Sequence, residues 1–304
     1  MSLSGNGHKT AVHFSKPPER VVSLVPSLTE SLFDLGFGSS VVGLTDYCVH
    51  PVVGLEHIPR LGGTKNPRVD EILGLQPDLV LANQEENTPA VIKALESAGI
   101  KVWVTFPKSV RQYLDILWIL VGIYQSRLAA ARLETLEIAL DWAESALAER
   151  KIWSYFCPIW RQAGEDAGNP SKVPPWWMTF NRDTYSDDLL RLMGGKNIFA
   201  DRIRRYPLMA DLSFMIPEEP GDRDTRYPHV TDDEISSRNP DVILLPDEPF
   251  PFNQTEAQHI RNLFANAPAV QKDRIFLLDG SLITWCGTRL GRALQELPVL
   301  VDIN

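Results

Sequence analysis

The sequence predicts an α/β protein made of two mostly parallel-sheet lobes that a single long helix bridges. Short apolar runs of strand length alternate with helical patterns along most of the chain, and this alternation is typical of parallel sheets. Residues 109–151 contain no proline and one glycine, and many of their apolar positions recur at spacings of three and four, as on one face of a helix. A twelve-residue unit occurs twice, as DEILGLQPDLVL at residues 70–81 and DEISSRNPDVIL at residues 233–244, with six identical positions.

The repeated unit indicates the domain organisation. Each copy has the pattern of a helix that proline ends, followed by a buried strand. A weaker match pairs Leu32, Leu35, Gly38 and Val41 with Leu189, Leu192, Gly195 and Ile198. We expect a flexible N-terminal segment at residues 1–19, an N-terminal α/β lobe at 20–108, a helical bridge at 109–151 and a C-terminal α/β lobe at 152–304. The alternative is that Pro-Asp precedes both strands by chance.

Composition limits the function classes. The 304 residues are 44% hydrophobic and carry a formal charge of −9, which argues against nucleic acid as the main partner. No apolar run approaches the roughly eighteen residues that a membrane span needs. The first twenty residues lack the apolar region of a secretory signal, so either the chain is cytosolic or a signal has been removed. The three cysteines are isolated and give neither a metal-site signature nor a disulfide framework.

In the first lobe, residues 21–25 have the pattern of a strand, and Pro26 and Ser27 follow at once. Ser27 and Glu30 have the spacing of a capping box, so we expect a helix to begin here. A helix N-terminus directly after a strand presents free backbone N–H groups at the sheet edge where ligands of α/β proteins bind. An ordinary capped helix fits the spacing equally well.

Three further strands are expected in this lobe, at residues 41–45, 79–82 and 101–105. Tyr47 lies in the loop after the first of them. Thr64 and Lys65 lie in the loop at residues 60–67, which ends with Asn66 as a helix N-cap and Pro67 as the first helical residue. Asn83 opens the polar loop after the second strand.

The bridge is expected to contain two helices. The first runs to about Gly122, and the second runs from a cap near Ser126 to about Arg150, a length of roughly 37 Å at 1.5 Å per residue. A helix of that length spans a domain.

The second lobe begins with an expected strand at residues 152–156. Residues 157–178 are its least regular part and end in a Pro-rich loop with Trp176 and Trp177, which we interpret either as a lid over an apolar ligand or as a plug that covers the core. Residues 181–184 cap a helix that runs through Leu192.

The rest of this lobe repeats the strand and helix pattern. Thr231 and Glu234 form a capping box for the second repeat helix. A strand at residues 242–245 leads into a loop with Phe250 and Phe252. After the last strand, at residues 275–278, the loop at 279–287 carries Trp285 into a helix from about Thr288 to Leu297.

No motif indicates catalysis. The six histidines are scattered without metal-ligand spacing, and the GxSxG pattern of a hydrolase is absent. Aromatic residues recur instead in loops at predicted strand ends, and such loops on two lobes form a cleft that suits a large, flat, partly apolar ligand. For each aromatic residue, packing in the core is the alternative. The predicted ligand-binding residues are Pro26, Ser27, Tyr47, Thr64, Lys65, Asn83, Trp176, Trp177, Tyr227, Phe250 and Trp285.

Several motifs together resemble a known family. RVVSLVPSLTESLFDLG, VVGLTDYCVHP, LGGTKNPRVDEILGLQPDLVLA, GGKNIFAD, RYPHVTDDEI and NPDVILLPDEP are similar to the cobalamin-binding substrate-binding proteins of ABC importers. These belong to the helical-backbone group of periplasmic binding proteins, which also carries ferric siderophores and haem. The similarity covers residues 20–297. It implies two α/β lobes bridged by one helix, a ligand in the cleft and no catalysis.

The resemblance also assigns residues. Tyr47 falls where the cobalamin binders have a pocket tyrosine, and Tyr227 where they have a pocket tryptophan. Asp70 and Asp233 fall where acidic residues dock onto arginines of the membrane permease, so that two carboxylates on opposite lobes each meet one subunit of the permease dimer. The alternative for both is a carboxylate that favours the helix dipole.

The chain also departs from that family. Thr64 and Lys65 replace a cleft tryptophan, and an acidic and basic pair is replaced around Ser281 and Trp285, while Trp176 and Trp177 are a possible compensation. The resemblance therefore implies a cobalamin-like corrinoid or another metal chelate as the ligand, with no covalent cofactor. A ferric siderophore or haem is the first alternative, with Tyr47, Tyr227 or His229 as an axial haem ligand. A cytosolic carrier or enzyme for a corrinoid or tetrapyrrole is the second. We expect a monomer that works outside the cytoplasm.

Overall fold

The computed structural model describes residues 14–163 and 173–301. Its contacts divide the chain into two compact units, Met1–Asp141 with Trp285–Gly291, and Trp142–Thr284 with Arg292–Asn304. We call them the first and the second unit. Of the N-terminal segment predicted to be flexible, residues 1–13 lie outside the described residues, as do residues 164–172 of the stretch predicted to be irregular.

The first unit contains a parallel sheet of four short strands in the order β2-β1-β3-β4. The strands are β1 (Val21–Ser23), β2 (Val41–Leu44), β3 (Leu79–Asn83) and β4 (Val102–Thr105). Each predicted strand of this lobe is present, with bounds that differ by at most two residues from those expected. A 3₁₀ turn, η1 (Gly38–Ser40), precedes β2. Because all four strands are parallel, their carboxyl ends meet at one edge of the sheet.

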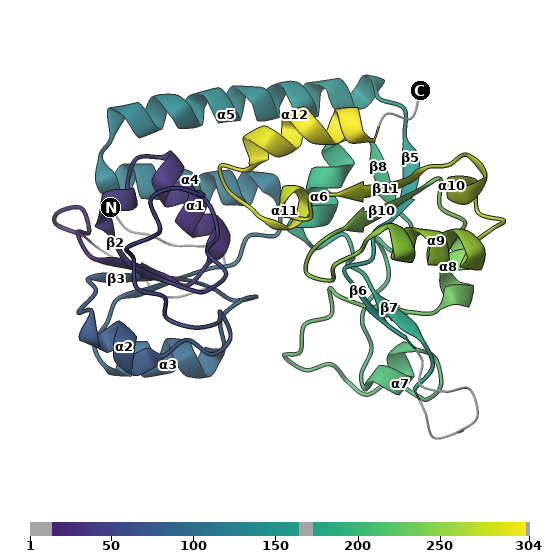
Figure 1. Cartoon of the computed structure of the whole chain (residues 1–304), viewed down its shortest axis with the longest axis horizontal. Helices are drawn as coiled ribbons and strands as arrows, with labels where there is room; N and C mark the ends of the chain where they lie inside the picture. The colour runs from purple at the N-terminus through teal and green to yellow at the C-terminus, as the bar shows by residue number, and fades with distance from the viewer. Residues whose placement is uncertain (1–13, 164–172, 302–304) are drawn as a thin grey trace. The chain divides into compact units, whose positions relative to one another are not determined.

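Helices cover both faces of this sheet (Figure 1). They are α1 (Pro26–Asp34), α2 (Val69–Gly74), α3 (Pro89–Ser97), α4 (Val110–Tyr124) and most of α5 (Arg127–Ala146). Alternate residues of the strands, such as Val22, Val80 and Val102, pack with Ile72 of α2 and Leu95 of α3 in one buried cluster. In Figure 1, α1 and α4 lie on the opposite side of the sheet. A parallel sheet covered on both faces explains why its strands are continuous apolar runs.

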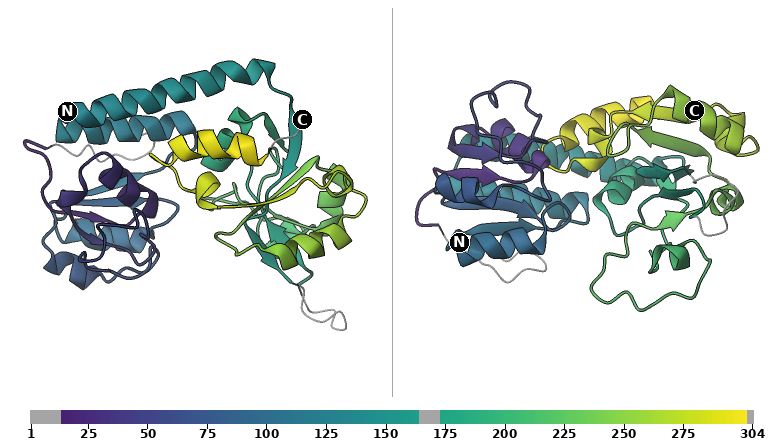
Figure 2. Two further views of the ribbon diagram at one scale, coloured as in Figure 1. Left: turned by 45° about the horizontal axis from the view of Figure 1, so that its top comes forward. Right: turned by 60° about the horizontal axis from the view of Figure 1, so that its bottom comes forward.

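The second unit contains a second parallel sheet in the order β11-β10-β5-β8. Its strands are β5 (Trp153–Phe156), β8 (Gly195–Asn197), β10 (Val242–Pro246) and β11 (Ile275–Leu278). Its helical elements are η2 (Leu147–Glu149), α6 (Tyr185–Leu192), α7 (Leu208–Asp211), α8 (Asp232–Arg238), α9 (Gln254–Leu263), α10 (Pro268–Gln271) and α11 (Ser281–Thr284), and α12 (Leu290–Leu300) begins in the first unit and ends in this one. The two views of Figure 2 show each sheet with its helices from other sides.

The two sheets have the same topology. β1, β2, β3 and β4 correspond in chain order and in sheet position to β5, β8, β10 and β11. The two copies of the repeated unit are α2 followed by β3, and α8 followed by β10, and the weaker match joins α1 and β2 to α6 and β8. The duplicated sequence pattern therefore corresponds to a duplicated arrangement of strands.

A small antiparallel sheet corrects the prediction of an irregular loop around Trp176 and Trp177. It consists of β6 (Trp160–Gln162), β7 (Trp176–Met178) and β9 (His229–Val230). The two prolines before Trp176 precede the strand and do not interrupt it, so they cost no ladder hydrogen bond. A three-residue strand lacks the length that makes a periodic pattern visible in the sequence.

Several helix caps are as predicted and two are not. The side chains of Ser126, Thr184 and Thr231 accept backbone N–H groups at the starts of α5, α6 and α8. The predicted capping box of Ser27 and Glu30 is wrong, because Val25 is the N-cap of α1 and caps without its side chain. In place of the box, Glu30 forms an ion pair with Arg289, and the Ser27 hydroxyl lies 3.4 Å from that of Tyr113.

The second error concerns α2. Asn66 was predicted as its N-cap and Pro67 as its first residue, but α2 begins at Val69 after Arg68 and has no side-chain cap. Pro67 forms an isolated bridge with Gly62 instead, so the loop extends two residues further than expected.

The helical segment that follows β4 in the chain is divided into two helices, as predicted. α4 ends at Gln125, whose φ of +52° is left-handed, and α5 starts after it and runs from the first unit into the second. The loop predicted at residues 279–287 contains the short helix α11. Residues 285–291 then return to the first unit, so the chain passes between the units at further points that the sequence did not indicate.

Candidate functional site

The carboxyl edge of each parallel sheet is the place to look for a ligand, because loops that follow parallel strands meet there. In the first unit this edge carries a segment of exposed apolar side chains directly after β2. Tyr47 is 62% exposed, and Val49, Val52 and Val53 are exposed as well. Arg60 holds the start of this segment by donating hydrogen bonds to the carbonyl oxygens of Thr45 (3.0 Å) and Cys48 (2.8 Å). The apolar side chains are thus presented to solvent on an anchored backbone.

The structure brings two other predicted residues to this segment. A β-carbon placed on Gly63 would lie 3.6 Å from Cε2 of Tyr47, so the Tyr47 ring lies beside the loop that continues into Thr64 and Lys65. The half-buried Trp285 ring meets the His50 ring edge-on at a centroid distance of 5.4 Å. Tyr47, Thr64 and Trp285 therefore belong to one part of the first unit, although Trp285 is far from the others in the sequence.

Residues 285–291 are fixed to the first unit by a buried ion pair. Arg289 donates from Nε to one carboxylate oxygen of Glu30 (2.8 Å) and from Nη2 to the other (2.6 Å), and its side chain is only 1% exposed. The guanidinium carbon of Arg289 also lies 5.0 Å from the centroid of the Trp285 ring, a cation–π arrangement. The ion pair sets the position of Trp285. No local sequence pattern indicates this pair, because Glu30 and Arg289 are 259 residues apart.

Asn83 and Asn87 connect the strand ends of the first unit. The Asn87 side-chain amide donates to the carbonyl oxygens of Leu24 (3.3 Å) and Thr64 (2.9 Å), and its carbonyl accepts from the Asn83 backbone (2.8 Å). Asn83 is buried, and its side chain bonds Thr105 and the Glu85 amide. Asn87, which sequence reasoning missed, thus holds the Thr64 loop in place. Lys65 is exposed and bonds the carbonyl oxygen of Glu85.

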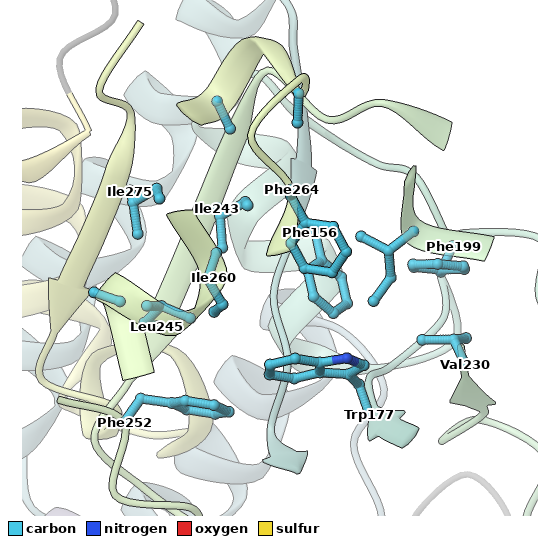
Figure 3. Close-up of a cluster of buried hydrophobic side chains, with 14 residues drawn as sticks. Phe156, Trp177, Phe199, Val230, Ile243, Leu245, Phe252, Ile260, Phe264 and Ile275 are labelled. Atoms are coloured by element: carbon cyan, nitrogen blue, oxygen red, sulfur yellow. The ribbon is translucent and has the colours of Figure 1, made fainter. Parts of the chain in front are cut away.

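In the second unit, Trp177 lies in the core rather than in a loop. It is 1% exposed and packs among Phe156, Val230 and Phe252, as Figure 3 shows, and its indole N–H donates to Asp232 at 2.7 Å. Of the two interpretations of this residue, lid and plug, the structure favours the plug. Trp177 is therefore a framework residue at a position where a ligand contact was expected.

The other predicted aromatic residues of this unit are partly exposed. Trp176 is half-buried and meets the His229 ring edge-on at 4.5 Å. Phe250 lies between the Trp160 ring (5.6 Å) and the Phe252 ring (4.7 Å), and Trp160 is 41% exposed. Tyr227 is half-buried, with the Arg226 guanidinium 5.3 Å from its ring centroid. Trp160 is an aromatic residue of this set that the sequence analysis did not single out.

A second segment of exposed apolar side chains follows β8. Ile203, Phe214, Met215 and Ile216 are each more than half exposed. The segment is anchored by Asp211, which is fully buried, pairs with Arg202 (2.9 Å) and accepts hydrogen bonds from the backbone and ring of His229 (2.7 and 2.9 Å). Burial alone would raise the pKa of Asp211, but the hydrogen bonds from His229 and Arg205 lower it below its ordinary value.

The predicted docking carboxylates are at the surface. Asp70 and Asp233 are exposed and lie in the first turns of α2 and α8, the two helices of the repeated unit. Acidic residues there also favour the positive end of the helix dipole. The two residues thus occupy equivalent positions in the two units.

The chemistry of the site is that of binding through aromatic and apolar surfaces. Among residues 14–163 and 173–301, no three His, Cys, Asp or Glu side chains are grouped so that they could hold a metal ion. Burial raises the pKa of the Cys48 and Cys157 thiols, which disfavours the reactive thiolate. No helix within those residues is both long and apolar enough to cross a membrane.

Comparison with known sequences identifies relatives across most of the chain. A family model described as periplasmic binding protein matches residues 21–282. An uncharacterized ABC transporter substrate-binding lipoprotein of Bacillus subtilis is 25% identical over 290 residues, which are 94% of this chain and 81% of that protein. A vitamin B12-binding protein of Vibrio cholerae is 23% identical over 287 residues, 94% of this chain and 90% of that protein.

Solved structures share the fold. The periplasmic vitamin B12 binding protein of Vibrio cholerae matches with a TM-score of 0.72 at 21% identity, over 94% of this chain and 98% of that one. A periplasmic heme-binding protein of Roseiflexus in its apo form matches with a TM-score of 0.67 at 22% identity, over 93% and 97%. At these identities the likeness establishes two parallel-sheet α/β lobes of the periplasmic binding protein type.

Proposed function

We propose that this chain, which belongs to the periplasmic binding protein family, is the substrate-binding component of an ABC importer that captures a cobalamin-like corrinoid and delivers it to a membrane permease. Members of the family bind and hand over substrates, so the chain is a binding protein and not an enzyme. The relatives named above include an ABC transporter lipoprotein and a vitamin B12 binder, which support the importer and the ligand class. An importer component works outside the cytoplasm, and we propose that location for this chain.

One observation carries the proposal. The exposed apolar segments, Tyr47 to Val53 and Ile203 to Ile216, follow β2 and β8, which are equivalent strands of the two duplicated sheets. Several exposed apolar side chains in one segment are a feature of binding surfaces, and we infer such a surface here. Such surfaces at the carboxyl ends of equivalent strands suit a large ligand with apolar faces. A corrin ring has this shape.

The residues proposed to contact the ligand follow from their exposure. In the first unit they are Tyr47, Thr64, Lys65 and Trp285, which are exposed or half-buried. Pro26 and Ser27 at the start of α1, which were predicted as contacts, are buried. In the second unit they are Trp176, Tyr227 and Phe250. We assign Asn83 and Trp177 to the framework, because both are buried and their polar groups bond within the protein.

Asp70 and Asp233 are proposed to dock onto the permease. Their exposed carboxylates lie in equivalent helices, one in each unit, and a permease dimer offers two equivalent basic surfaces to such a pair. We expect the binding protein to act as a monomer against that dimer.

Haem or a ferric siderophore is the second proposed ligand class. The fold is shared with a heme-binding protein, and the Tyr47 ring, 62% exposed, is available as an axial ligand to haem iron. Tyr227 is half-buried and remains a second candidate. His229 fits poorly, since it is 4% exposed and its ring is held by Asp211.

Isothermal titration of the apo-protein tests the function. Cyanocobalamin, haemin and a ferric siderophore are titrated in parallel, and we expect saturable one-to-one binding of cyanocobalamin. Tyr47→Ala should weaken that binding, while Val299→Ala, a change at an exposed apolar residue of α12, should not. Binding of an iron chelate but not of cyanocobalamin would mean that the ligand is a haem or a siderophore and not a corrinoid. Binding of none of the three would contradict the proposal.

A further inference from the structure

The segment that follows β8 is rich in arginine although the whole chain is acidic. Residues 202–226 contain Arg202, Arg204, Arg205, Arg223 and Arg226. Four of these pair with carboxylates: Arg202 with Asp211 and Glu234, Arg205 with Asp211, Arg223 with Glu218, and Arg226 with Asp224. Arg204 differs from them.

The Arg204 guanidinium has no hydrogen bond or salt bridge to any described residue, and this sets it apart from the other four. Its Nε atom is buried without a hydrogen-bond partner, as is the Nε atom of Arg205. Against the effect of burial, the hydrogen bonds and the charge of Arg226 lower the pKa of Asp224, and the Arg204 charge adds to this lowering. Asp224 is already engaged by the Nε (3.0 Å) and Nη2 (2.5 Å) of Arg226. Arg204 as a whole is half-buried, so the remaining N–H groups of a guanidinium that no described carboxylate engages are open to an acceptor that a ligand supplies.

The position of Arg204 is nevertheless well fixed. Its guanidinium lies 4.8 Å from the centroid of the Tyr206 ring, and that of Arg223 lies 4.2 Å from the same ring. The Tyr206 hydroxyl donates to the carbonyl oxygen of Asp224 (2.6 Å), and the Arg204 backbone donates to that of Thr225 (2.8 Å). A guanidinium stacked on an aromatic ring keeps its N–H edge available for a planar carboxylate or phosphate.

The location also favours a ligand. The side chain of Asn181, in the turn before α6, donates to the carbonyl oxygens of Arg202 and Thr225, which places both ends of the segment at the carboxyl edge of the second sheet. Ile203, next to Arg204, is exposed, and Arg205 bonds Ser213, the residue before the exposed Phe214. A cation and apolar side chains thus occur in one segment, as a ligand with an apolar body and an acidic group requires.

We propose that Arg204 binds an anionic oxygen group of the transported ligand, either a carboxylate or a phosphodiester. The inference rests on the proposed function, because it assumes that the protein binds a transported ligand. That the ligand has an anionic group is inferred from residues 202–226. Both proposed ligand classes carry such a group, since cobalamins have a phosphodiester in the nucleotide loop and haem has two propionate carboxylates.

Four probes separate these sources. Wild type, Arg204→Gln and a control, Arg261→Gln, are titrated with cyanocobalamin and dicyanocobinamide, which lacks the phosphodiester, and with haemin and its dimethyl ester, which lacks the carboxylates. Arg261 belongs to α9 and is paired with Asp273 (3.1 Å). We expect Arg204→Gln to weaken the acid-bearing ligand about tenfold or more and its neutral analogue less than about twofold. Equal affinities for wild type and Arg204→Gln, or equal losses for both members of a pair, would overturn the proposal.

A second measurement decides the case in which wild type binds none of the probes, which would contradict the proposed function. The melting temperatures of the three proteins are then compared in millimolar citrate and in NaCl of equal ionic strength. An anion site predicts that citrate stabilises wild type and Arg261→Gln, but not Arg204→Gln. The same response in all three proteins would overturn the site. The variant should fold, because no described residue loses a hydrogen bond to the replaced side chain.

Discussion

The two units have the same arrangement of four parallel strands, but the loops that follow the carboxyl ends of those strands differ. In the first unit, β1 ends at Ser23 and α1 begins at Pro26, whereas in the second unit β5 ends at Phe156 and α6 begins only at Tyr185. The added length holds β6 and β7, which form the small antiparallel sheet together with β9. A duplicated framework thus carries different loops at the edge of the sheet where ligands of α/β proteins bind.

The units also differ in their buried charges. In the first unit a buried bidentate pair, Glu30 with Arg289, fixes residues 285–291. In the second unit Arg202, Arg205 and His229 all interact with the buried Asp211, which lies in the segment after β8. The Glu30 carboxylate is paired with one described cation, Arg289, whereas the Asp211 network retains contacts when one member is lost. The largest mutational effect is therefore expected in the first unit.

Arg289→Met should be the most destabilising of the changes considered. It leaves the Glu30 carboxylate buried without its cation, and breaking a buried pair in this way costs about 3–5 kcal/mol. Arg292→Met is the matched control. Arg292 is about half exposed and pairs with Glu296 one turn away in α12 and with Asp279, and each of these exposed pairs is worth at most about 1 kcal/mol. Urea denaturation followed by circular dichroism measures both. A difference below about 1 kcal/mol between the two variants would contradict this account of the anchor.

Asp211→Asn should cost somewhat less, about 3 kcal/mol at pH 7, because Arg202 keeps its second partner Glu234. The pKa of Asp211 is lowered in the folded protein, so its ionised form contributes stability that is fully present above the unfolded value near 3.9. That contribution is lost as the pH falls through the folded pKa.

The test of this network is urea denaturation of wild type and Asp211→Asn at several pH values. The stability gap between them should stay constant from pH 7 to pH 5 and narrow below about pH 4. A gap that narrowed already between pH 7 and pH 6 would point to another titrating group.

Charge reversal at Asp70 and Asp233 tests whether the two units contribute equally to the proposed docking on the permease. If the proposed docking is right, Asp70→Lys and Asp233→Lys should each weaken association with the reconstituted permease by about tenfold or more, since a like charge then meets a basic surface. The affinity for the transported ligand should not change in either variant. Glu71→Lys controls for a mere change of net charge at the same helix start. A loss caused by only one of the two carboxylates would show that the units do not dock equivalently.

The framework was predictable from the sequence because its signals are local. Buried strands appear as apolar runs, and the repeated twelve-residue unit is by itself enough to indicate that α2 and β3 correspond to α8 and β10. Tyr47 and Asp70 could be placed at a strand end and a helix start for the same reason.

The site was less predictable because it depends on contacts between distant residues. Nothing near Glu30 in the sequence indicates Arg289, so Glu30 was interpreted as part of a capping box, the local pattern it matches. Trp177 belongs to the core because β7 pairs with β6 and β9, and these pairings leave no local pattern. The partner of each neighbouring arginine, and hence the exception of Arg204, emerges only when the segment is folded.

Substitutions at the starts of α2 and α8 are expected to change the free energy of unfolding least. Thr231 caps α8 by accepting the Glu234 amide at 3.3 Å, whereas α2 begins after Arg68 with no side-chain cap. Thr231→Ala should therefore cost about 1 kcal/mol. Asn66→Ala, at the residue that the sequence indicated as the cap of α2, should change stability by no more than about 0.5 kcal/mol. Equal losses from the two substitutions would mean that Asn66 supports α2 after all, and that the repeated units resemble one another more closely than their helix starts suggest.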